Sequence, residues 1–177
     1  SLFLVRNHFN EIGLDPAFRV ADEGEIKLLA QDVLEELLEE ANFVLEKIAP
    51  YKVQCPVVID VEKVSDSEAR MNQISLEQRT ANTLVFLETV EAAGYEVMLY
   101  HNMEMGTLML DMEKFEDYIK WFAYYNKEIY YPYLFDVWQY SDKGLLEGYE
   151  GIEKHIDLNV YKGSEEEFLE QFGKEVE

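Results

Sequence analysis

The chain contains the stretch Pro56-Val57-Val58-Ile59-Asp60-Val61-Glu62, in which three β-branched residues follow a proline and lead into two acids. A short apolar run of this kind is typical of a β-strand that is buried on both faces. Because side chains two positions apart point to the same side of a strand, Asp60 and Glu62 should face one substrate bond together. Such a pair can divide the roles of acid and base. A strand that merely ends in solvated acids is the simpler alternative in so acidic a chain.

The composition predicts a single folded domain over residues 1–177. Hydrophobic residues make up 48% of the chain and aromatic residues 14%, enough for a substantial core. Fifteen basic residues stand against 37 acidic ones, which gives a formal net charge of −22. This charge argues against binding to nucleic acid and to anionic membranes, and it fits a neutral or cationic substrate. Because no stretch is long and apolar enough to span a bilayer, we expect no membrane insertion.

Neither a disulfide nor a metal site is expected. Cys55 is the single cysteine, which excludes an intrachain disulfide and a multi-cysteine metal site. Its place beside the apolar strand predicts a buried structural thiol. His101 and His155 lack a metal-ligand spacing with the acids, so solvated or locally bonded histidines are the better interpretation. We therefore expect no metal and no cofactor.

Along the chain, strand patterns alternate with helix patterns, which favours a parallel α/β sheet or barrel. Asp32 with Glu35, and Ser75 with Gln78, can form capping boxes that open two of the helices. The predicted strands cover residues 2–5, 26–30, 56–62, 95–102, 121–125, 135–140 and 156–161. The predicted helices cover residues 32–48, 75–94 and 111–119, and Ser164 begins a helical extension over 164–177.

Several predicted strands end in residues that suit a carbohydrate site. Active sites of barrels gather at the carboxyl ends of the strands, where aromatic rings can stack on sugars and acids or amides can bind hydroxyls. The aromatic members can equally belong to the packed core, and Asp157 can be a turn residue. Trp138 and Tyr140 should share one face of their strand, with Gln139 opposite. The candidates are Asp60, Glu62, Tyr100, Asn102, Tyr125, Trp138, Tyr140 and Asp157.

At these residues the chain resembles the glycoside hydrolase family 25 lysozymes, the muramidases that cut peptidoglycan. The resemblance begins with the Asp-x-Glu strand and continues through four more regions in the family's order and approximate spacing, over residues 40–163. These regions contain Ala92-Ala93-Gly94-Tyr95 with Met98-Leu99-Tyr100-His101-Asn102, Trp121-Phe122-Ala123-Tyr124-Tyr125-Asn126, Trp138-Gln139-Tyr140-Ser141, and Ile156-Asp157-Leu158-Asn159. It implies an irregular TIM-like β/α barrel.

The resemblance also implies a reaction, namely hydrolysis of the β-1,4 bond between N-acetylmuramic acid and N-acetylglucosamine. Glu62 matches the family's general acid/base, and Asp60 matches the acid that orients the N-acetyl group of the substrate. Asp157 matches a further active-site acid. The family is described as retaining, with the acetamido group of the substrate as nucleophile, a recognised exception to the usual two-carboxylate scheme.

The implied partner is the glycan strand of peptidoglycan, bound by Tyr100, Asn102, Tyr125, Trp138 and Tyr140. The implied location is extracellular or at the cell wall, either as a secreted protein or as a phage-encoded one that is released at lysis.

One part of the family pattern has no counterpart. The family's first barrel strand carries an Asp-Val-Ser-like block, which is absent here, and residues 18–31 are compressed. We therefore expect a barrel that is incomplete at its N-terminal side, through truncation, loss of residues or natural shortening. An open barrel exposes strand edges, which a homo-oligomer could cover. Because the missing aspartate lines the site, the alternative function is a non-catalytic domain that binds cell-wall glycan or serves in interactions.

Overall fold

The computed structural model describes residues 38–63, 72, 74–148 and 155–172. The chain divides between Glu35 and Glu36 into two units, and every described residue belongs to the second. The strands predicted at 2–5 and 26–30, the first part of the helix predicted at 32–48, and most of the polar segment after Lys63 lie outside the described residues. The prediction of a single domain over 1–177 stays a prediction.

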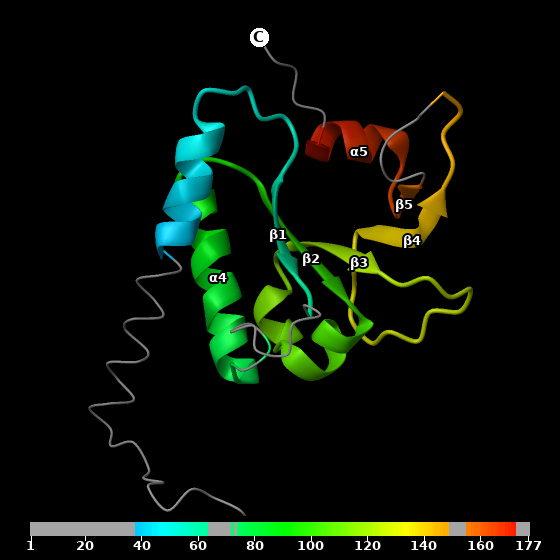
Figure 1. Ribbon diagram of the computed structural model, residues 1–177, viewed down its shortest axis with the longest axis horizontal. Helices are drawn as coiled ribbons and strands as arrows, with labels where there is room; N and C mark the ends of the chain where they lie inside the picture. Colours follow the sequence, from blue (N-terminus) through cyan, green and yellow to red (C-terminus); the bar gives the residue numbers. More distant parts are fainter. Residues whose placement is uncertain (1–37, 64–71, 73, 149–154, 173–177) are drawn as a thin grey trace, which may run out of the picture. The chain divides into compact units, whose positions relative to one another are not determined.

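A five-stranded sheet forms the centre of the described fold (Figure 1). The strands follow one another in space as they do in sequence: β1 (Val57–Val61), β2 (Val97–Asn102), β3 (Ile119–Ala123), β4 (Val137–Gly144) and β5 (Ile156–Tyr161). β1 to β4 pair in parallel, as the sequence predicts. Closure into a barrel stays a prediction, because β1 and β5 are the outer strands of the sheet within the described residues.

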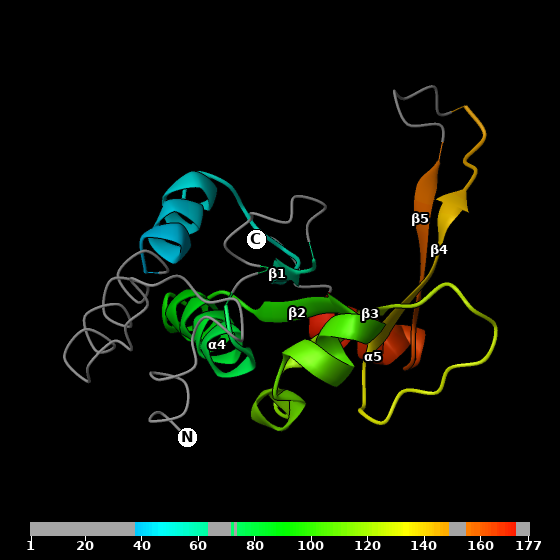
Figure 2. The same ribbon diagram turned by 60° about the horizontal axis from the view of Figure 1, so that its bottom comes forward.

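The expectation of a parallel sheet does not hold for β5, which pairs antiparallel with β4. Residues 145–155 alone connect the two strands, and a parallel crossover usually needs a dozen residues or more. The chain therefore turns back on itself, and Figure 2 shows β4 and β5 side by side at one side of the sheet. The register of this pair shifts between Gln139 and Ser141 and again before Gly144.

The helices predicted at residues 32–48 and 75–94 are confirmed within the described residues. The first is helical over 38–48, and the second is α4 (Leu76–Ala92). The Ser75 side chain caps α4 by accepting a hydrogen bond from the Gln78 backbone N–H. Gly94 follows the helix with a φ of +92°, a conformation that glycine adopts at little cost.

The connection between β2 and β3 differs in detail from its prediction. Residues 111–119 were expected to form a short helix, and a 3₁₀ turn, η2 (Met112–Phe115), is found there. A π-helical turn, η1 (Met105–Met109), precedes it and is missed by the periodicity of the sequence. The helix predicted from Ser164 is confirmed as α5 (Glu165–Phe172). Ser164 and Glu167 cap it reciprocally, because each side chain accepts a hydrogen bond from the backbone N–H of the other.

The main core lies between the sheet and α4. Leu87 and Val90 of α4 are fully buried together with Val61 of β1 and Leu99 of β2. Ala41 of the 38–48 helix joins the same cluster, as do side chains from η1 and η2. Burial of this cluster fixes which face of β1 and β2 points toward the helices. The alternate residues of each strand, including Asp60 and Tyr100, consequently face the other way.

Candidate functional site

The strand register brings the predicted polar residues to one edge of the sheet. Asp60 in β1 stands opposite Tyr100 in β2, which stands opposite Trp121 in β3. Two residues further along β2, Asn102 stands opposite Ala123, and Ala123 stands opposite Gln139 in β4. Glu62 follows the last residue of β1. The carboxyl-terminal halves of β1 and β2 thus bring Asp60, Glu62, Tyr100 and Asn102 together, as the sequence predicted.

Asp60 and Glu62 differ in their surroundings. Asp60 is exposed as a residue, yet partial burial of its carboxyl raises its pKa, and the charge of Glu62 raises that pKa further. Glu62 is half-buried, and its Oε1 accepts a hydrogen bond from Asn102 Nδ2 at 3.2 Å. The two acids are thus close enough to interact, and one of them is held by a neighbouring strand.

Asn102 links Glu62 to the turn that follows β2. Its Oδ1 accepts a hydrogen bond from the backbone N–H of Met105, the first residue of η1, at 3.1 Å. The amide is therefore fixed at both ends, with its NH₂ group directed at the carboxylate. In the structure these hydrogen bonds orient Glu62, and the predicted role of Asn102 as a substrate ligand stays a prediction.

Gln139, which the sequence placed opposite Trp138 and Tyr140 at a strand end and to which it gave no role of its own, joins two of the predicted aromatic residues. It is buried, with 3% of its surface exposed, and its Oε1 accepts hydrogen bonds from two tyrosines. The Tyr100 hydroxyl donates to it at 2.6 Å and the Tyr125 hydroxyl at 3.1 Å. The signal that could have found it is a polar amide between two aromatic residues in a strand, because a buried amide needs partners.

Tyr125 connects this trio to the acids around it. Burial raises its pKa, a hydrogen bond with Tyr100 opposes that shift, and the charges of Asp142, Asp157 and Glu62 raise the pKa further. Asp157 is exposed on β5, and the structure brings it within electrostatic range of Tyr125.

Trp138 and Tyr140 form a separate aromatic pair. Their ring centroids are 5.7 Å apart, as expected for residues on one face of β4. The Trp138 indole donates to the backbone carbonyl of Tyr124 at 2.8 Å, and the Tyr140 side chain is exposed. Gln139 between them is buried, so the pair lies away from the trio around the amide. Their role in binding a substrate stays a prediction.

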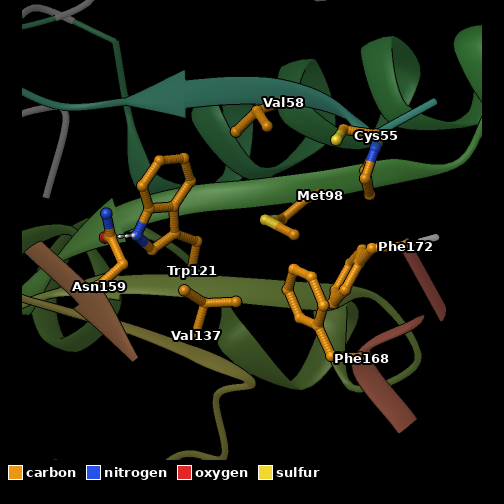
Figure 3. A pocket seen from close by; sticks show the side chains of 9 residues that line it. Cys55, Val58, Met98, Trp121, Val137, Asn159, Phe168 and Phe172 are labelled. Carbon is orange, nitrogen blue, oxygen red and sulfur yellow. Dashed lines mark hydrogen bonds between the residues drawn. The ribbon is translucent and has the colours of Figure 1, made fainter. Parts of the chain in front are cut away.

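An apolar pocket of about 290 Å³ continues the site face toward the amino ends of the strands (Figure 3). Val58 and Met98 lie two residues before Asp60 and Tyr100, so they share the face of the acids. Trp121 closes the pocket toward the site, where its indole donates to Asn159 Oδ1 at 2.8 Å and its ring meets Tyr100 edge-on. The remaining lining residues are Cys55, Pro56, Val137, Asn159, Phe168 and Phe172.

The expectation of a buried thiol at Cys55 is wrong, because this residue is exposed. Cys55 lies two residues before the first residue of β1, at a bend outside the sheet, and residues 51–55 are all exposed. Burial in this region begins only at Pro56. The thiol lines the pocket without being enclosed by it.

His101 is locally bonded, as expected, in that its Nε2 lies 2.7 Å from the Tyr131 hydroxyl. Within the part of the chain that the structure describes, no group of three or more His, Cys, Asp or Glu side chains could hold a metal ion. Among the same residues, no helix is long and apolar enough to cross a membrane.

The sequence pattern of the glycosyl hydrolases family 25 matches residues 32–149, two thirds of the chain. The chain belongs to this family. The matched range contains Asp60, Glu62 and all five predicted substrate-binding residues, whereas Asp157 lies beyond its end. The strands predicted at 2–5 and 26–30 lie before its start.

Solved structures agree with the family assignment. A family 25 glycosyl hydrolase from Bacillus anthracis is 32% identical, with a TM-score of 0.58 over 69% of this chain and 56% of that one. The CTP1L endolysin is 23% identical, with a TM-score of 0.60 over 80% of this chain and 46% of that one, and so shows the fold alone. The chain thus spans about half the length of these relatives.

A shorter similarity points elsewhere. Thirty-nine residues are 59% identical to part of an ATP-dependent helicase/nuclease from Lachnoclostridium phytofermentans. This segment is 22% of the chain but only 3% of that protein, so nothing of that protein's activity follows from it.

Proposed function

We propose that the chain is a peptidoglycan hydrolase that cleaves the β-1,4 bond between N-acetylmuramic acid and N-acetylglucosamine. Glu62 acts as the general acid/base and Asp60 assists. The observation that carries this proposal is the half-buried Glu62 carboxylate at the end of β1, held by Asn102 beside Asp60. Membership of the glycosyl hydrolases family 25 supports the reaction class.

In the first step, Glu62 donates its proton to the glycosidic oxygen as the bond between that oxygen and the anomeric carbon breaks. The acetamido oxygen of the substrate forms a bond to the same carbon, and Asp60 accepts a hydrogen bond from the acetamido N–H. In the second step, Glu62 takes a proton from water, and the oxygen of that water attacks the anomeric carbon. The bond between the anomeric carbon and the acetamido oxygen then breaks, which restores the acetamido group. Two inversions give net retention, which is the substrate-assisted variant of glycoside hydrolysis.

Two observations favour peptidoglycan as the substrate. One is exposed aromatic surface at the carboxyl edge of the sheet, and the other is the ligand of a structural relative. Tyr125 exposes aromatic surface that can stack on a sugar ring. The autolysin LytC from Streptococcus pneumoniae, 20% identical with a TM-score of 0.60 over 72% of this chain, was solved with a synthetic peptidoglycan ligand. An extracellular or cell-wall location follows from this substrate and is part of the proposal.

The test is mass spectrometry of purified peptidoglycan after incubation with the wild type, Glu62→Gln and Glu113→Gln. Glu113 is an exposed acid on η2 and serves as the matched control. We expect new fragments with N-acetylmuramic acid at the reducing end from the wild type and the control, and none from Glu62→Gln. Intact glycan in all three samples, together with retained binding to the sacculus, would instead support a glycan-binding domain.

Asp157 is proposed as a further acid of the same site. The effect of its charge on Tyr125, a member of the trio around Gln139, supports this proposal. Asp157→Asn should lower turnover while leaving the melting temperature close to that of the wild type, because the side chain is exposed. Unchanged turnover in this variant would remove Asp157 from the site.

A further inference from the structure

The hydrogen bonds around Gln139 restrict what two tyrosine hydroxyls can offer a ligand. A phenol hydroxyl has one proton to donate and lone pairs that can accept. Tyr100 donates its proton to Gln139 Oε1 at 2.6 Å, and Tyr125 donates to the same oxygen at 3.1 Å. A carbonyl oxygen can accept both bonds at once. Both protons therefore point into the trio, and only acceptor lone pairs remain for a ligand.

The two tyrosines differ in access. Tyr125 is 51% exposed, whereas Tyr100 is 8% exposed. Tyr125 is thus the member that a ligand can reach, whereas Tyr100 is buried. The phenols also interact directly with each other. Even a proton shared between the two phenol oxygens would stay inside the trio.

The surrounding groups also accept hydrogen bonds rather than donate them. The carboxylates of Glu62, Asp142 and Asp157 act electrostatically on Tyr125. A ligand group at this position meets negative charge and phenol lone pairs together. Hydroxyl and amide N–H groups are favoured there, and carbonyl or carboxylate oxygens are repelled.

We infer that Gln139 is a positioning residue that makes Tyr125 an obligate hydrogen-bond acceptor, and so selects ligand groups that donate, namely the hydroxyl or acetamido N–H of a sugar. This inference rests on the proposed function for the identity of the ligand. It assigns no chemical step to Gln139, which acts only through the tyrosines.

The experiment compares three variants. Gln139→Met removes the shared acceptor at similar volume. Gln139→Glu keeps an acceptor oxygen but has no NH₂ group. Gln171→Met is the matched control, because Gln171 Oε1 accepts a hydrogen bond from the Tyr161 hydroxyl at 2.8 Å, a similar pair located on α5. All are made in the Glu62→Gln background, so that binding is measured without turnover.

The measurement is the dissociation constant for chitotetraose, a soluble β-1,4-linked N-acetylated glycan, obtained by calorimetry. We expect Gln139→Met to weaken binding about five- to tenfold, which is the effect of one lost hydrogen bond. Gln139→Glu should bind within about threefold of the parent, and Gln171→Met should match the parent. Spectrophotometric titration of the tyrosines should show phenol ionisation at lower pH in Gln139→Met, because a phenol that donates a hydrogen bond holds its proton more firmly.

Three results would overturn the inference. One is unchanged binding in Gln139→Met. Another is an equal loss of binding affinity in Gln139→Met and Gln139→Glu, since the amide NH₂ group would then act as a donor to the phenols. The third is an equal loss in Gln171→Met, which would make the effect a general one of structure. Failure of the proposed function would look different, namely absent turnover in the wild type with the binding differences intact.

Discussion

The two faces of the sheet differ in the burial of their ionisable side chains. On the face that carries Leu99 and packs against α4, His101 is fully buried, and Arg79 of α4 and Lys120 of β3 are also almost fully buried. Arg79 donates to the backbone carbonyls of Met109 and Ile74. Lys120 Nζ donates to the backbone carbonyls of Phe115, Glu116 and Tyr118. On the other face, Asp60, Glu62 and Tyr125 remain at least partly accessible.

The difference shows that a perturbed pKa does not by itself mark a functional group. Burial lowers the pKa of His101 to about 4, with the charge of Lys120 acting in the same direction and a hydrogen bond at the Leu99 backbone opposing it. This histidine is packed against Phe122 and Tyr131 and has no access to a substrate. The more modest shift at Asp60 arises beside a second acid at an open edge, which is the arrangement that chemistry requires.

The largest effect should come from the site face and should leave stability unchanged. Glu62→Gln removes the proposed acid/base while keeping the shape of the side chain and an acceptor for Asn102. We expect turnover of peptidoglycan to fall about 10²- to 10⁴-fold. The melting temperature should stay within a few degrees of the wild type. A similar fall in Glu113→Gln would show that the loss does not belong to the site.

The next effect belongs to the helix-covered face and depends on pH. His101 has a folded pKa of about 4, below its unfolded value of about 6.5, so the unfolded chain binds the extra proton first. Its contribution to stability is therefore complete above about pH 6.5 and falls by up to about 3 kcal/mol as the pH drops to about 4.

His101→Gln removes this titration, so its unfolding free energy should depend less steeply on pH between 6.5 and 4 than that of the wild type. Urea unfolding across that range measures the slope. His155→Gln, at an exposed position, is the control. Equal slopes in the wild type and His101→Gln would contradict the expected burial of the neutral imidazole.

A third test removes an internal hydrogen-bond donor. Lys120→Met keeps the length of the side chain but leaves three backbone carbonyls without their donor. We expect a loss of about 2 kcal/mol in unfolding free energy, measured by chemical denaturation. Lys114→Met, on the exposed side of η2, should cost little. Turnover per folded molecule should be unchanged in both variants. A loss of turnover in Lys120→Met alone would contradict the view that this face of the sheet serves stability and not catalysis.

The smallest effect on the free energy of unfolding is expected from a substitution of Asp60. Its raised pKa means that the folded protein holds the proton more firmly than the unfolded chain does. The associated stability is present at low pH and is lost as the pH rises through the folded pKa. Asp60→Asn should therefore stabilise the protein at about pH 7, by about 1 kcal/mol or less because the group is largely solvated, and should have no such effect near about pH 3. Equal melting temperatures at neutral pH would contradict this.

Much of the fold was predictable because it depends on residues that are close in sequence. The apolar run before Asp60 predicts β1, and the spacing of Ser75 and Gln78 predicts the cap of α4. The bounds of β5 were predicted as found, whereas those of β3 and β4 were displaced by two or more residues. The strand expected at 121–125 is β3, Ile119–Ala123, whose buried Lys120 interrupts the apolar pattern. From sequence alone a lysine predicts an exposed position, and its burial can be recognised only when its tertiary partners are known.

The sequence by itself determined the family, the Asp60–Glu62 pair and the alternation of strands with helices, because periodicity, capping and ordered motifs are local properties. Only the tertiary structure decided that Asn102 orients Glu62, that Gln139 joins Tyr100 to Tyr125, and that β5 runs antiparallel to β4. The residues in these side-chain contacts are up to 40 positions apart, so their pairing depends on strand register. Register is set by packing of the whole sheet, which no single stretch of the chain encodes.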